Sequence, residues 1–138
     1  MEIIEIHEHL FLSPDIDEWD SVHAREISVV IDLEGGLDHG VPVLPDYMMY
    51  IYLPIHDDGL PNLKKLHEVA KLGANLVREG HKVLSHCGMG LNRSALVAAL
   101  ILMYLGKDGK EAVEILRDKR PGALFNDNFA DYLLGLEL

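Results

Sequence analysis

The sequence contains a single cysteine, few basic residues and no apolar run long enough to cross a membrane. The lone Cys87 excludes a disulfide within the chain and is typical of a protein kept in a reducing compartment. The longest apolar run extends from Ala95 to Leu105, and the N-terminus is neither basic nor followed by a long apolar segment. We therefore expect a cytoplasmic protein without a signal peptide.

Basic side chains are especially scarce in the first half of the chain. Residues 1–60 hold 14 acidic side chains and one basic side chain, Arg25, whereas residues 61–138 hold 9 acidic and 11 basic side chains. The net charge of −11 opposes binding to nucleic acid and to anionic membranes. It would suit a phosphorylated peptide with basic flanks, although an acidic surface that is merely solvated is the simpler explanation.

The apolar pattern alternates between short strand-like segments and longer helix-like segments. Strands are predicted over 2–6, 9–12, 27–33, 47–55 and 82–86, and helices over 62–79, 94–105, 108–119 and 128–136. Ser13-Pro14-Asp15 predicts a turn that starts a short helix through Trp19 and Val22. The pattern favours an α/β fold, with a largely parallel central sheet of about five strands flanked by helices. The first two strands are expected to form a hairpin at the sheet edge, and residues 1–138 to form a single domain.

A seven-residue loop, Cys87 to Arg93, joins a short apolar strand to the most apolar helix and is called the 87–93 loop below. Gly88 and Gly90 permit the tight backbone that such a loop needs. Backbone N–H groups of the loop and of the helix N-terminus can converge on an anion, and Arg93 adds a planar fork of donors. The same positive field favours the thiolate form of Cys87 near neutral pH. The sequence therefore predicts a nucleophilic sulfur at the bottom of an anion-binding loop.

His86-Cys87, five residues and Arg93-Ser94 together resemble the Cys-x5-Arg signature of the cysteine-dependent protein tyrosine phosphatases. The resemblance implies that the Cys87 thiolate attacks phosphorus, that Ser94 helps the sulfur to leave, and that His86 is a buried organiser of the loop. It also implies that no metal or cofactor is needed. The phosphate oxygens would be held by the loop amides and the guanidinium, that is, by Gly88, Met89, Gly90, Leu91, Asn92 and Arg93.

The resemblance extends to the dual-specificity subgroup of that superfamily and covers most of residues 27–138. Four residues separate Asp57 from Asn62-Leu63, which is similar to the spacing of the general acid in this subgroup. Asn126-Asp127-Asn128-Phe129 resembles the subgroup's closing segment. The resemblance implies the dual-specificity phosphatase fold, with Asp57 as general acid and the adjacent Asp58 as the alternative.

The expected activity is hydrolysis of phosphotyrosine in proteins, with phosphoserine and phosphothreonine as further substrates, by a protein that we expect to be a monomer. Two alternatives stay open. Gly-Leu-Asn-Arg followed by a hydroxyl residue is also similar to the RNA 5′-triphosphatase branch, and a phosphate-binding module without turnover would keep the same loop. His7 and His9, two apart on a predicted strand, could bind a metal, but ordinary edge histidines explain them more simply.

Overall fold

The computed structural model describes all residues from 1 to 138 and contains one five-stranded sheet, whose strand order is β1-β2-β5-β3-β4. Strands β2, β5, β3 and β4 run parallel, and β1 pairs with β2 in the antiparallel sense at one edge. The mostly parallel sheet and its edge hairpin are therefore confirmed. The strands are β1 (Ile4–His7), β2 (Leu10–Ser13), β3 (Val29–Asp32), β4 (Met49–Tyr52) and β5 (Val83–His86).

The parallel strands end level with one another. His86, the last residue of β5, stands in register with Ser13 of β2 and with Asp32 of β3, and Asp32 is in turn in register with Tyr52 of β4. The loops that follow all four strands consequently meet at one edge of the sheet. In open α/β sheets this carboxyl edge is where ligands bind. Because β5 is the central strand, its loop lies in the middle of that edge.

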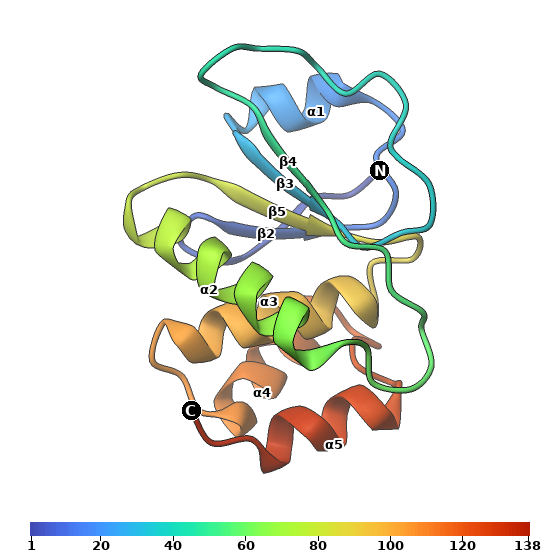
Figure 1. The fold of residues 1–138 in the computed structure, drawn as a ribbon, viewed down its shortest axis with the longest axis vertical. Helices are drawn as coiled ribbons and strands as arrows, with labels where there is room; N and C mark the ends of the chain where they lie inside the picture. Colours follow the sequence, from blue (N-terminus) through green and yellow to red (C-terminus); the bar gives the residue numbers. More distant parts are fainter.

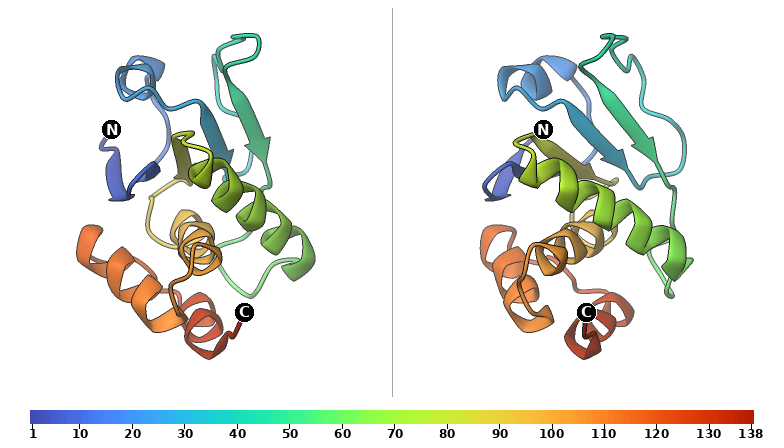
Figure 2. Two further views of the ribbon diagram at one scale, coloured as in Figure 1. Left: turned by 90° about the vertical axis from the view of Figure 1, so that its left-hand side faces the viewer. Right: turned by 60° about the vertical axis from the view of Figure 1, so that its left-hand side comes forward.

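Helices cover both faces of the sheet, but unequally (Figures 1 and 2). The short α1 lies on one face, where Val22 packs with Phe11 and Ile27 in a small buried cluster. The other four helices lie on the opposite face and share the main hydrophobic core. The helices are α1 (Trp19–Ala24), α2 (Leu63–Arg78), α3 (Arg93–Tyr104), α4 (Gly109–Lys119) and α5 (Asp127–Gly135). None of them has the length and apolar character needed to cross a membrane.

Helix α3 is the centre of the molecule, as its uniformly apolar sequence predicts. All residues from Ser94 to Met103 are buried between the sheet and the surrounding helices. The surrounding helices begin at polar caps, because Asn62 accepts a hydrogen bond from the Lys65 amide and Asp108 accepts one from the Glu111 amide. A helix buried on all sides cannot shift easily, so the loop at its N-terminus starts from a fixed point.

Two local expectations are wrong. The segment Ser13-Pro14-Asp15 does not start a helix: Ser13 ends β2, and α1 begins only at Trp19. Residues 14 and 15 instead run along the 87–93 loop, where the Asp15 amide donates to the Gly88 carbonyl at 3.3 Å. The placement of His7 and His9 on a single strand is also wrong, because β1 ends at His7 and His9 lies in the β1–β2 turn with a φ of 68°.

Candidate active site

The 87–93 loop leaves the end of β5 and enters the N-terminus of α3 at the carboxyl edge of the sheet. Gly90 has a φ of +67°, and a Cβ atom there would lie 2.7 Å from the Pro14 nitrogen. Only glycine fits a position with this conformation and this close approach to another backbone segment. Asn92 caps α3 without a side-chain hydrogen bond, so the first amides of the helix remain available to an anion.

Cys87 lies at the bottom of this loop and is 2% exposed. Its Sγ lies 3.2 Å from the hydroxyl oxygen of Ser94, which is itself fully buried in the first turn of α3. The thiol donates to this oxygen, and the hydroxyl can donate to the sulfur when the sulfur is ionised. The two residues predicted to act as nucleophile and as its partner are therefore in direct contact.

The Arg93 guanidinium faces Glu34, a residue that the sequence analysis did not single out. Its two terminal nitrogens donate to the two Glu34 carboxylate oxygens at 3.3 and 3.0 Å. A Cβ atom at Gly88 would clash with a Glu34 oxygen, so the carboxylate rests directly against the loop backbone. The signal in the sequence is the position of Glu34, two residues beyond the buried β3 strand at the carboxyl edge.

Electrostatics favour the charged forms of this pair. Burial works against the ionised carboxylate of Glu34, but hydrogen bonds from Arg93 and from the Gly35 and Gly88 backbone outweigh it and lower the pKa of Glu34. Burial likewise works against the Arg93 cation, but Glu34 and Cys87 raise the pKa of Arg93. The Arg93 Nε is buried and has no hydrogen-bond partner. Glu34 thus engages both terminal nitrogens, and Nε is the one Arg93 nitrogen that an anion bound in the loop would have to satisfy.

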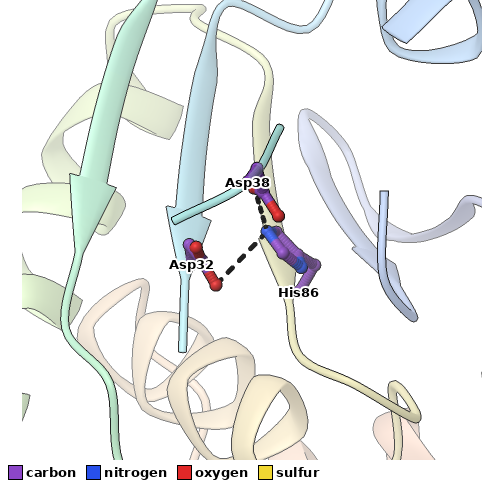
Figure 3. A group of neighbouring side chains, drawn as sticks. All are labelled: Asp32, Asp38 and His86. Carbon is purple, nitrogen blue, oxygen red and sulfur yellow. Dashed lines mark hydrogen bonds and ion pairs between the residues drawn. The ribbon is translucent and has the colours of Figure 1, made fainter. Parts of the chain in front are cut away.

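His86 is buried behind the nucleophile and is held by two carboxylates (Figure 3). Its Nε2 lies 2.7 Å from Asp38 and 3.5 Å from Asp32, and the Tyr50 hydroxyl donates to Asp32. Burial raises the pKa of Asp38, with Asp32 adding to the effect and His86 opposing it. These contacts fit the predicted role of His86 as a buried organiser of the loop.

The same three side chains are the one group in the structure with the spacing of metal ligands. The ligand atoms of Asp32, Asp38 and His86 lie within 4.8 Å of one another. A divalent cation could use two carboxylates and an imidazole. However, the His86 Nε2 already hydrogen-bonds Asp38, and both Asp32 oxygens accept hydrogen bonds, from the Glu34 amide and the Tyr50 hydroxyl. The hydrogen bonds account for the cluster without a metal.

Asp57 lies in the loop between β4 and α2 and contacts the 87–93 loop directly. The Asn92 side-chain amide donates to one Asp57 carboxylate oxygen at 2.9 Å, and the Asn126 amide donates to the other at 2.8 Å. Asp58 enters the same network only through its backbone carbonyl, which accepts from Asn126 and Asn128. Of the two adjacent acids, Asp57 is the one whose carboxylate is tied to the loop that holds Cys87.

Arg120 supports the 87–93 loop on its outer side. Its guanidinium donates to the Met89 carbonyl at 3.1 Å and to the Gly90 carbonyl at 3.3 Å. These contacts hold two loop carbonyls in place while the loop amides remain free for other partners. No local sequence pattern predicts these contacts, because the two partners lie 30 and 31 residues away in the chain.

The parallel strands end at one edge of the sheet, and the loop at that edge holds a buried thiol, Cys87, and an arginine, Arg93, that is paired with a carboxylate. These features together are typical of the cysteine-dependent phosphatases. Residues 11–137 match the family described as "Dual specificity phosphatase, catalytic domain", and the chain belongs to that family. It is 36% identical over 94 residues to "Cyclin-dependent kinase inhibitor 3" of Rattus norvegicus, covering 58% of this chain and 44% of the relative. It is 29% identical to "Tyrosine-protein phosphatase vhp-1" of Caenorhabditis elegans, over 94% of this chain but 20% of that protein.

A solved structure is similar over nearly the whole chain. The active form of Tk-PTP superimposes with a TM-score of 0.75 at 32% sequence identity, covering 95% of this chain and 92% of that one. The predicted fold, a largely parallel five-stranded sheet flanked by helices as in dual-specificity phosphatases, is confirmed. The chain spans less than half the length of the two curated relatives named above.

Proposed function

We propose that this chain hydrolyses phosphate monoesters of proteins, phosphotyrosine first and phosphoserine and phosphothreonine second, through a phosphocysteine intermediate. The observation that carries the proposal is the pairing of two features in one loop. The Cys87 sulfur lies 3.2 Å from a hydroxyl that can hydrogen-bond it, and the Nε of Arg93 is buried and unpartnered. A nucleophile and an anion site separated by so few residues suit attack on a bound phosphoryl group.

In the first step the Cys87 thiolate attacks phosphorus, so that an S–P bond forms while the P–O bond to the leaving group breaks. Arg93 and the amides of residues 88–93 hold the three equatorial oxygens. Asp57, protonated, donates its proton to the leaving oxygen. In the second step Asp57 accepts a proton from water as the water oxygen attacks phosphorus. The S–P bond then breaks, and the Ser94 hydroxyl donates a hydrogen bond to the departing thiolate. No step needs a metal or cofactor.

Two exposed apolar side chains favour an aryl phosphate. Met89 lies in the 87–93 loop and is 61% exposed, and Phe125 is 60% exposed. Phe125 stands between Leu124, whose amide donates to the Leu91 carbonyl, and Asn126, whose amide donates to the Asn92 side chain. Apolar surface at the rim of the loop suits the ring of phosphotyrosine better than a triphosphate chain. The acidic charge of the chain likewise disfavours RNA.

The proposal is tested by comparing phosphate release from phosphotyrosine peptides, phosphoserine peptides and RNA carrying a 5′-triphosphate. We expect the highest kcat/KM on phosphotyrosine peptides, particularly those with basic flanks, and no significant release from the RNA. The activity should survive EDTA and be blocked by vanadate. A higher kcat/KM on the RNA would assign the chain to the RNA 5′-phosphatase alternative, and binding of phosphate without turnover of any substrate would favour the silent binding module.

Replacing Asp57 with alanine should lower kcat on phenyl phosphate by about 10²-fold, because a poor leaving group needs a proton donor. The matched control is the same change at the neighbouring Asp58, whose carboxylate makes no hydrogen bond to the 87–93 loop. Asp58→Ala should keep most of the activity. The measurement is steady-state kinetics of both variants on the same substrate. A larger loss at Asp58 than at Asp57 would reverse the assignment of the general acid.

A further inference from the structure

A closed ring of hydrogen bonds links the candidate general acid to the 87–93 loop. The Asn92 side chain donates to Asp57, and the Asn126 side chain donates to the other oxygen of the same carboxylate. The backbone amide of Asn126 completes the ring by donating to the Asn92 side-chain oxygen at 3.0 Å. Asn92 is only 2% exposed, so its side chain has little freedom to choose other partners. Three segments that are distant in the sequence therefore meet on one carboxylate.

The orientation of both amides is fixed by backbone groups. The Asn92 Oδ1 accepts from the Asn126 backbone amide, so its NH2 group must face Asp57. The Asn126 Oδ1 accepts from the amides of Asn128 and Phe129 as the N-cap of α5, so its NH2 group must also face Asp57. A flipped amide would place an oxygen against the carboxylate and leave backbone donors unpaired. The two donors are thus aimed at Asp57 by the fold.

Apart from the hydrogen bonds that the Asp58 carbonyl accepts from Asn126 and Asn128, the loop that carries Asp57 has few other restraints. Residues 56–60 are all exposed, and Asp57 itself is an exposed side chain. The Arg93 guanidinium reaches the Ile55 carbonyl at 3.4 Å, which restrains the start of the loop but not the carboxylate. A protonated carboxyl keeps acceptor capacity on its oxygens while its O–H donates elsewhere. The two asparagines can therefore hold the plane of the carboxyl group through both steps of the reaction.

We propose that Asn92 and Asn126 are positioning residues that hold Asp57 over the phosphate-binding loop, so that the anion site and the general acid are assembled as one unit. The inference rests on the proposed function, in which Asp57 transfers the proton. Asn92 directly precedes Arg93, so a backbone that places the guanidinium also places the donor to Asp57. Asn126 ties the same carboxylate to the rigid start of α5.

The test uses the variants Asn92→Ala and Asn126→Ser, because serine still caps α5 while removing the amide donors. Each is assayed on phenyl phosphate and on p-nitrophenyl phosphate, which has the better leaving group. We expect kcat on phenyl phosphate to fall about 10- to 100-fold, the cost of misplacing a catalytic group. The loss on p-nitrophenyl phosphate should be several-fold smaller, and KM should change little. Asn128→Ala, which removes only a contact to the Asp58 carbonyl, is the matched control and should keep the wild-type ratio of the two rates.

The decisive comparison repeats both changes in the Asp57→Ala background, where neither should lower kcat further. Equal losses on the two substrates, or a further loss without Asp57, would overturn the positioning role. If vanadate inhibits Asn92→Ala at the same concentration as it inhibits the wild type, the 87–93 loop of this variant remains folded. Asn126→Ser tests the positioning role without any change in that loop. The proposed function itself would be refuted by a wild-type chain without phosphatase activity. It would also be refuted if Asp57→Ala lowered kcat equally on phenyl phosphate and on p-nitrophenyl phosphate.

Discussion

Replacing Cys87 with serine should abolish turnover while phosphate binding persists. The serine hydroxyl stays protonated near neutral pH, and the candidate base Asp57 is engaged by Asn92 and Asn126 rather than by residue 87. The loss should be roughly 10⁴-fold or more in kcat, since a reaction through a covalent intermediate has no route without its nucleophile. The loop amides and Arg93 do not depend on the sulfur, so the binding of inorganic phosphate or tungstate, measured by calorimetry, should remain within about tenfold of wild type.

Assaying Cys87→Ser with and without EDTA addresses the one alternative chemistry that the structure offers. The carboxylates of Asp32 and Asp38 and the imidazole of His86 have the spacing of metal ligands. If activity survived in Cys87→Ser and was then lost on adding EDTA, a metal-dependent phosphatase at that cluster would replace the phosphocysteine route. Residual activity that was indifferent to EDTA would point to a contaminating enzyme, which a preparation of the double variant Cys87→Ser, Arg93→Ala would reveal.

The fold could be predicted from local pattern because most elements are defined by their own sequence. The apolar run 95–105 predicts a buried helix, and Asn62 and Asp108 predict the starts of α2 and α4 through their caps. The segment after β2 could not be predicted in this way. Pro14 suits the first turn of a helix, but residues 14 and 15 contact the 87–93 loop and lie outside any helix, and the helix starts only at Trp19.

Some residues of the candidate site lie close together in the sequence, and others are brought together only by the fold. Cys87, Arg93 and Ser94 share one loop and helix start, so their spacing alone brings them together. Glu34 reaches Arg93 only because β3 lies beside β5 in the sheet, with Asp32 in register with His86. No local sequence pattern gives the order of the strands in the sheet. The contact of Glu34 with Arg93 was therefore not predicted. Asn126 was noticed through a resemblance, but its contact with Asp57 spans 69 residues and follows from the packing of α5.

Replacing Arg93 with lysine should lower kcat/KM by about 10³-fold, although the positive charge is kept. An ammonium group is a point charge and cannot face the Glu34 carboxylate with one edge while presenting a second edge to a phosphoryl group. Lysine would pair with Glu34, whose carboxylate already rests against Gly88, and would leave the anion site without its fork. Steady-state kinetics on a phosphotyrosine peptide measure the loss, and thermal unfolding of the variant checks that the fold is intact.

Glu34→Gln is the partner experiment, because it keeps the shape of the side chain and removes its charge. If Glu34 holds the end of the fork so that the Nε edge faces the substrate, the variant should lose several-fold in kcat/KM, far less than Arg93→Lys does. If Glu34 instead competes with the phosphoryl group for Arg93, the same change should raise kcat/KM by lowering KM. The buried, unpartnered Nε favours the first outcome, since a carboxylate that filled the anion site would have taken that donor as well.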